Sequence, residues 1–155
     1  MSTAQIWEIE STSLEDTLKI AALVGKKLKG GEVIELVSDL GGGKTVFVKG
    51  MAKGMGIKDI VGSPSFTLSS EYKAGDLTLH HYDFYRLGEP GLMTNTLGEV
   101  IGKPEAVVAV EWANLVDTLL PQDRLSIHIR AIGDNSRHLR FSYPEHMIYL
   151  IPSNT

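Results

Sequence analysis

The sequence contains no cysteine among its 155 residues. Disulfide bonds, thiolate catalysis and zinc sites built on thiolates are therefore excluded, and the composition suits the cytosol. Long apolar runs are also absent, since the longest, such as residues 107–110, are far too short to span a bilayer. Residues 1–10 lack the basic and apolar stretches of a secretory leader. We therefore expect a cytoplasmic protein that does not act at a membrane.

The sequence also lacks an excess of positive charge. It has 15 lysine and arginine residues against 19 aspartate and glutamate residues, which gives a formal net charge of −4. This balance argues against a general nucleic-acid-binding surface, so we expect any link to RNA to run through a partner protein. The chain is 43% apolar and 22% charged, which is typical of a soluble globular protein. Its length predicts one domain over residues 1–155.

Strand and helix patterns alternate along the chain. They predict strands at residues 6–9, 33–37, 77–85, 107–111, 124–131 and 139–143, and helices at residues 14–28, 45–55 and 89–100. The last two strands flank a turn and should form an antiparallel hairpin. Strands separated by helices imply right-handed crossovers and ligands at the carboxyl ends of the strands. We therefore predict a three-layer α/β fold with a largely parallel central sheet.

The first predicted helix has a recognisable start and an apolar stripe. Ser11, Thr12 and Ser13 offer hydroxyls that could cap this helix, and Glu15, three residues after Thr12, completes the pattern of a capping box. Helical spacing predicts that one stripe faces the core, and its members are Leu14, Leu18, Ala21, Gly25 and Leu28. Gly30 and Gly31 should end the helix.

A glycine-rich turn at residues 38–45 joins a predicted strand to a predicted helix. Such a turn directs backbone N–H groups and a helix N-terminus at phosphates. We expect Lys44 to reach the β- and γ-phosphates of a nucleotide and the Thr45 hydroxyl to ligate Mg²⁺. The loop residues expected to surround the phosphates are Asp39, Leu40, Gly41, Gly42 and Gly43. The sequence therefore predicts a P-loop NTPase-like domain with ATP and Mg²⁺ as ligands.

Ser38 stands where the pattern G-x-x-x-x-G-K-[ST] has its first glycine. That glycine usually supplies a conformation that a Cβ disfavours, and a residue forced to positive φ costs about 1–2 kcal/mol. We expect such strain to weaken nucleotide binding without abolishing it. A turn that merely joins strand to helix is the alternative, but Gly43, Lys44 and Thr45 in this context favour phosphate binding.

Acidic residues end two of the predicted strands. Glu111 follows the apolar residues 107–110, and Asp83 follows residues 77–82. Mg²⁺ prefers hard oxygen ligands, so carboxylates beside the phosphate loop would complete a site for phosphoryl transfer. Either residue alone could equally be a capping or surface acid.

His80 and His81 are adjacent and should point to opposite faces of a strand, which argues against a two-histidine metal site. His81 shares a face with Asp83, and we interpret it as a hydrogen-bonded residue behind the site rather than a catalytic one. Trp112 beside Glu111 suits either packing or an indole beside a bound nucleotide, and these two interpretations stay open.

Four blocks of the sequence together resemble the TsaE (YjeE) family over nearly the whole chain. The blocks are residues 39–45 (DLGGGKT), residues 63–68 (SPSFTL) with Glu71 and Tyr72, residues 81–87 (HYDFYRL) and residues 111–113 (EWA). The phosphate loop alone would specify only a superfamily. The second and third blocks are peculiar to this family.

The resemblance implies a small ATPase that binds ATP and Mg²⁺. It also implies that the chain works with TsaB and TsaD, which assemble threonylcarbamoyladenosine at position 37 of ANN-decoding tRNAs. By motif match, Thr45 and Glu111 would contact Mg²⁺, and Lys44 and Asp83 would support hydrolysis. Residues 63–67 would form a switch-like loop, and Thr12 would approach the adenine. Ser38, Ser65 and the poorly matching residues 88–104 depart from the family pattern.

Two other functions fit the same phosphate loop. A small-molecule kinase would gather several arginines around the transferred group. This chain has five, which are Arg86, Arg124, Arg130, Arg137 and Arg140, and it has no lid-like insertion after the loop. A nucleotide-gated adaptor with vestigial hydrolysis is the second alternative, and strain at Ser38 would favour it.

Overall fold

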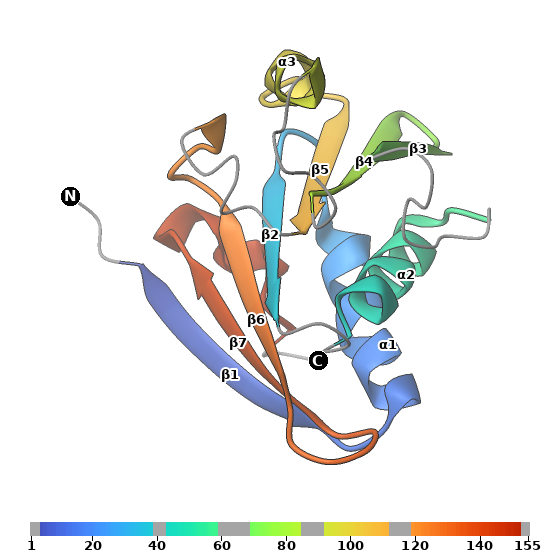
Figure 1. The fold of residues 1–155 in the computed structure, drawn as a ribbon, viewed down its shortest axis with the longest axis vertical. Coiled ribbons are helices and arrows are strands. Elements are labelled where there is room, and N and C mark those ends of the chain that lie inside the picture. The colour runs from blue at the N-terminus through green and yellow to red at the C-terminus, as the bar shows by residue number, and fades with distance from the viewer. Residues whose placement is uncertain (1–3, 39–42, 59–68, 85–91, 112–118, 153–155) are drawn as a thin grey trace.

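A computed structural model describes residues 4–38, 43–58, 69–84, 92–111 and 119–152 of the chain (Figure 1). Its elements in chain order are β1 (Gln5–Ser11), α1 (Leu14–Lys27), β2 (Val33–Ser38), α2 (Lys44–Met55), β3 (Ser69–Ala74), β4 (Leu77–Asp83), α3 (Leu92–Val100), β5 (Ala106–Glu111), β6 (Leu125–Ala131), β7 (Arg137–Tyr143) and the 3₁₀ helix η3 (Glu145–Leu150). The predicted helices and strands are all present, with small changes at their described ends, while the predicted strand end at residue 85 and helix start at residues 89–91 lie outside the described residues. No helix among these residues is long and apolar enough to cross a membrane.

The strands form one seven-stranded sheet in the order β1-β7-β6-β2-β5-β4-β3. The four central strands β6, β2, β5 and β4 are parallel, while β1, β7 and β3 pair antiparallel at the edges. The structure therefore confirms the parallel centre and the C-terminal hairpin of β6 and β7. Strand β3 was not predicted, because its residues SSEYKA are mostly polar and lack the apolar alternation of a half-buried strand.

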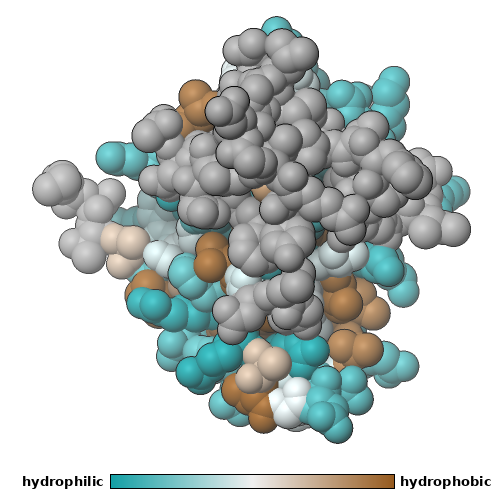
Figure 2. Space-filling model, in the orientation of Figure 1, coloured by the Kyte–Doolittle hydropathy of each residue, from teal (hydrophilic) through white to brown (hydrophobic). Residues whose placement is uncertain are grey.

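Helices cover both faces of this sheet, which confirms the three-layer prediction. Helices α1 and α2 pack on one face against side chains such as Ile34, Leu36 and Ala109. Leu97 of α3 packs on the opposite face with Val108 and other apolar residues. In Figure 1, α1 and α2 lie together while α3 lies apart from them. The described part of the surface in Figure 2 shows hydrophilic and hydrophobic residues intermingled, without a broad apolar patch.

The start of α1 differs from the predicted capping box by one residue. Ser13 is the N-cap, and its Oγ accepts a hydrogen bond from the Asp16 N–H at 3.0 Å. The Asp16 carboxylate in turn accepts from the Thr12 N–H at 3.0 Å. Asp16, rather than Glu15, therefore returns the hydrogen bond. Ser13 and Asp16 have the same three-residue spacing as the predicted pair, so spacing alone could not choose between them.

The buried stripe of α1 agrees with the predicted one at Ala21, Gly25 and Leu28 and differs from it at Leu14 and Leu18. The buried residues are Thr17, Ile20, Ala21, Val24 and Gly25, with Leu28 just beyond the helix, whereas Leu14 is 43% exposed. The helix has apolar residues on two overlapping stripes, and parts of both are buried, with Ala21 and Gly25 against α2. The Thr17 hydroxyl is buried as well and hydrogen-bonds the buried Ser11 hydroxyl at 2.6 Å.

Three glycines bring α1 and α2 into close contact. A Cβ on Gly25 would lie 2.1 Å from the Met51 carbonyl oxygen, and one on Gly54 would lie 2.1 Å from the Ala22 carbonyl oxygen. A Cβ on Gly50 would meet the Ala21 Cβ at 2.6 Å. No side chain fits at these separations, so the glycines determine how closely α2 approaches α1. The position of α2 matters because the helix begins with Lys44 and Thr45.

Candidate functional site

The carboxyl ends of the central strands bring the two predicted acids together. In the parallel register of β4 and β5, Asp83 lies opposite Glu111, and Leu36 of β2 also pairs with Glu111. His81, Asp83 and Glu111 alternate with residues that pack on the α3 side. They therefore face the side of the sheet that carries α2. Two carboxylates from segments far apart in the sequence thus end beside one another.

Helix α2 begins at this same edge of the sheet. Gly43 is its N-cap, with a left-handed φ of 110° that favours glycine. The first turn contains no acidic residue, and no side chain hydrogen-bonds at the cap. A helix start of this kind, with its N–H groups and positive dipole end, suits an anion. Residues 39–42, which include the predicted phosphate ligands Asp39, Leu40, Gly41 and Gly42, lie outside the described residues.

Lys44 is buried, with 6% of its surface exposed, and its ammonium group reaches the last residue of β2. Nζ donates to the Ser38 carbonyl at 3.2 Å and to the Ser38 hydroxyl at 3.4 Å. The charge is thus held at the carboxyl end of β2, where a phosphate bound by the α2 N-terminus would meet it. Thr45 lies in the first turn of α2 and is partly exposed. The structure places both residues where the motif predicts them.

The strain predicted at Ser38 is not found. Ser38 is the last residue of β2 and pairs with Ile129 in the parallel ladder. An extended strand conformation suits serine and needs no glycine. The prediction was wrong because it assigned Ser38 to the turn, whereas the strand extends one residue further than the apolar pattern indicated. Ser38 instead supplies two acceptors to Lys44.

The two histidines of β4 point to opposite faces, as predicted. His81 is fully buried, and its Nε2 lies 2.5 Å from Oε2 of Glu111, which is 2% exposed. His80 lies on the other face, 3.6 Å from the Glu71 carboxylate. Burial lowers the pKa of His80, and this effect outweighs the opposing charge of Glu71. The prediction that His81 is a hydrogen-bonded residue on the face of Asp83 is confirmed, and its place behind a functional site stays a prediction.

Arg137 is a buried residue beside the phosphate loop that the sequence analysis did not select. A Cβ placed on Gly43 would lie 3.5 Å from its Nε. Its Nη1 donates to the carbonyls of Gly133, Asp134 and Ser136, which braces the turn between β6 and β7. The alternation of inward residues along β7, which starts at position 137, was the signal that could have revealed it.

Thr12 lies next to the same turn. Its carbonyl accepts from the Ser136 hydroxyl at 3.5 Å, so Arg137 links the surroundings of Thr12 to the N-cap of α2. The role of Thr12 beside an adenine stays a prediction. Trp112 lies outside the described residues, so neither interpretation of its indole is tested.

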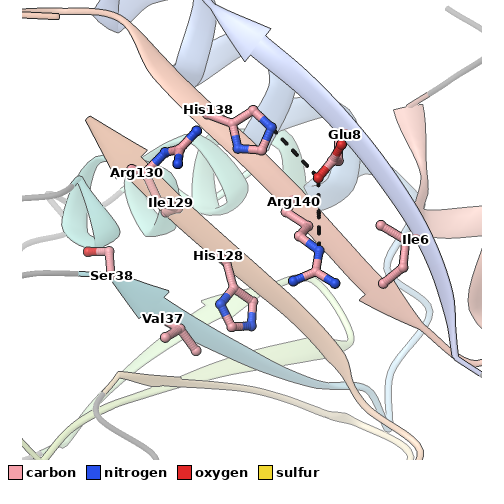
Figure 3. A pocket seen from close by; sticks show the side chains of 9 residues that line it. All are labelled: Ile6, Glu8, Val37, Ser38, His128, Ile129, Arg130, His138 and Arg140. Atoms are coloured by element: carbon pink, nitrogen blue, oxygen red, sulfur yellow. Dashed lines mark ion pairs between the residues drawn. The ribbon is translucent and has the colours of Figure 1, made fainter. Parts of the chain in front are cut away.

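A separate hollow of about 730 Å³ lies on the other face of the sheet, next to Ser38 (Figure 3). Its lining includes Arg130, His128 and Ile6. His138 and Arg140 are directed at Glu8, with nitrogen to oxygen distances of 3.8 and 3.9 Å. None of the predicted catalytic or metal-binding residues lines this hollow. The candidate chemistry therefore stays on the α2 side of the sheet.

The chain matches the family described as "Threonylcarbamoyl adenosine biosynthesis protein TsaE" over residues 11–139. The chain belongs to the TsaE family. This is a family of P-loop nucleotide-binding proteins, in agreement with the loop at the start of α2. The resemblance predicted from the four sequence blocks is therefore confirmed.

Curated TsaE relatives cover most of this chain. The relative from Bacillus subtilis is 43% identical over 129 residues, which are 83% of this chain and 80% of the relative. The relative from Treponema pallidum is 36% identical over 129 residues, covering 83% and 95% of the two chains. Each bears the name "tRNA threonylcarbamoyladenosine biosynthesis protein TsaE". The crystal structure of Bacillus subtilis YdiB superposes with a TM-score of 0.78 at 38% identity, covering 94% of this chain and 90% of that one.

The oxygen atoms at this TsaE site suit Mg²⁺, which needs few protein ligands, better than they suit a metal ion that is coordinated by protein side chains alone. The described residues contain no group of three histidine, aspartate or glutamate side chains that could hold a metal. They do bring a hydroxyl, Thr45, and two carboxylates, Asp83 and Glu111, to one edge of the sheet. Mg²⁺ commonly takes one or two such oxygen ligands and completes its shell with water and phosphate. The site therefore fits a metal that arrives with a nucleotide.

Proposed function

We propose that this chain binds ATP with Mg²⁺ and hydrolyses it slowly or in response to partners. It would act with TsaB and TsaD in the cytoplasm to form threonylcarbamoyladenosine at position 37 of ANN-decoding tRNAs. The proposal rests on the way in which four side chains meet at one edge of the sheet in this member of the TsaE family. Lys44 and Thr45 begin α2 at the sheet edge where β4 and β5 end in Asp83 and Glu111.

Each of these residues has a distinct part in the proposal. The N–H groups of Gly43 and the following turn, together with Lys44, hold the phosphates. Thr45 and Glu111 hold Mg²⁺, which neutralises charge that develops on the phosphates when it is bound. Asp83, opposite Glu111 in the ladder, orients water and metal during hydrolysis. Lys44, whose Nζ donates to Ser38, would turn to the phosphate oxygens of a bound nucleotide.

The described arginines argue against the kinase alternative. Arg130 and Arg140 line the hollow on the opposite face, and Arg124 binds Glu35 and the Pro121 carbonyl. Arg137 alone of these four lies next to Gly43, and it braces a turn. The adaptor alternative loses its main support, because Ser38 lies in a strand without strain. Hydrolysis is therefore the function that the site favours.

Nucleotide binding is tested with Lys44→Ala and Thr45→Ala against Lys49→Ala, which removes an exposed lysine from the same helix. Calorimetric titration with Mg²⁺ and a non-hydrolysable ATP analogue should show binding lost in the first two variants and kept in the third. Circular dichroism should show an intact fold in all three. Unchanged affinity in both site variants would exclude this loop as the binding site.

The role in tRNA modification is tested by reconstitution with TsaB and TsaD. Purified TsaB and TsaD, tRNA, ATP and a preformed donor of the threonylcarbamoyl group should yield the modified nucleoside in full amounts only when this protein is added. Lys44→Ala should fail to replace the parent protein, while Lys49→Ala should replace it fully. Equal yield without the protein would refute the proposed role while leaving nucleotide binding as a separate result.

A further inference from the structure

Glu111 is a carboxylate buried at the end of β5, with only 2% of its surface exposed. A buried carboxylate needs hydrogen-bond donors, because burial without them is costly. The described residues supply one such donor, which is Nε2 of His81 at 2.5 Å from Oε2. His81 pairs with Ala109 in the ladder, two residues before the point where Asp83 meets Glu111. The imidazole therefore reaches Glu111 diagonally from the neighbouring strand.

This contact determines how the carboxylate can present its second oxygen. A hydrogen bond to Oε2 restricts rotation of the carboxylate about its last bond, so Oε1 keeps one direction. In metal sites, partners behind the ligands orient them in this way, and their loss weakens metal binding. We propose that His81 is a positioning residue that holds Glu111 for Mg²⁺. This inference rests on the proposed function, which assigns Glu111 to the metal.

The surroundings of His81 argue against a purely packing role. Its side chain is fully buried, and among the described residues its Nδ1 has no hydrogen-bond partner. A buried polar atom without a partner is unfavourable, and an apolar side chain would fill the same space without that penalty. Its neighbour His80 shows the contrast, since it faces the other side and pairs with Glu71 near solvent. The histidine at position 81 is explained by its directed N–H.

Two amide substitutions separate the N–H donor from the rest of the ring. The amide nitrogen of His81→Gln reaches about as far as Nε2, whereas that of His81→Asn stops near the position of Nδ1. His80→Gln is the matched control on the opposite face. Calorimetry with ATPγS, in Mg²⁺ and separately in EDTA, gives each protein a ratio of metal-loaded to metal-free affinity. Thermal melting followed by circular dichroism checks the fold.

We expect His81→Asn to lower this ratio about tenfold, with its metal-free affinity unchanged. His81→Gln and His80→Gln should keep the ratio of the parent protein. Equal ratios in the parent and both position-81 variants, or an equal loss in both, would overturn the positioning role. If His81→Asn does not fold, His81→Gln decides. A fall in its ratio of metal-loaded to metal-free affinity would contradict the proposal, and a ratio equal to that of the parent protein would support it. A parent protein without any Mg²⁺ dependence would refute the metal assignment of the proposed function itself.

Discussion

The close packing of α1 on α2 predicts that Gly25→Ala destabilises the protein, although alanine is the better helix former. A Cβ at position 25 would lie 2.1 Å from the Met51 carbonyl oxygen and 2.9 Å from its carbonyl carbon. Both atoms belong to the backbone of α2, so no side-chain rotation can relieve the overlap. One helix must move away from the other, and apolar contacts between them are lost.

The size of the effect follows from two opposing terms. Overpacking against backbone should cost about 3 kcal/mol, the upper part of the usual range. Replacing a helical glycine recovers about 1 kcal/mol of helix propensity, which leaves a net loss of about 2 kcal/mol. Gly98→Ala is the matched control, because Gly98 is an exposed residue of α3 and a Cβ there meets nothing within 4 Å. That variant should gain about 0.5–1 kcal/mol.

Urea denaturation monitored by circular dichroism measures both variants. The midpoint should fall for Gly25→Ala and rise for Gly98→Ala, with the slope of the transition unchanged. Because α2 carries Lys44 and Thr45, Gly25→Ala should also weaken ATP binding, and Gly98→Ala should not. A rise in midpoint for both variants would show that the two helices are not in backbone contact at Gly25, and the reasoning would be refuted.

Three further predictions concern single residues of the strands. Asp83→Ala should reduce ATP turnover much more than ATP affinity, and a collapse of affinity with normal turnover per bound complex would assign it another role. Ser38→Gly should not tighten ATP binding, because Ser38 is an unstrained strand residue, and calorimetry showing tighter binding would restore the strain hypothesis. Burial lowers the pKa of His80 below 6.5; the charge of Lys103 acts in the same direction, and the charges of Glu71 and Glu105 oppose it. As the pH falls below 6.5, the unfolded chain therefore binds a proton at this histidine that the folded protein does not. The stability that neutral His80 contributes should therefore be fully present above about pH 6.5 and decline below it. Urea midpoints measured above and below this pH should fall less for His80→Gln than for the parent protein.

The features that depend on neighbours along the chain could be predicted from the amino-acid sequence. Residues 38–45 identify a phosphate loop because strand, glycine-rich turn and helix follow one another directly. Glu111 and Asp83 were recognisable because each ends a strand whose residues alternate or run apolar. Parallel strands end at one edge, so their proximity also followed from the predicted topology. Local order and the periods of helix and strand were sufficient for these inferences.

The features that depend on strand register and on which face of an element is covered became visible in the folded structure. The pairing of β2 with Ile129 of β6 draws Ser38 into the sheet and removes the predicted strain. The offset of β4 and β5 brings His81 to Glu111, 30 residues away, and the start of β7 brings Arg137 to Gly43. Helix α1 carries two overlapping apolar stripes, and core packing buries Ile20 and Val24 beside the predicted Ala21 and Gly25. These outcomes arise from contacts between distant segments, whose relative placement no local period specifies.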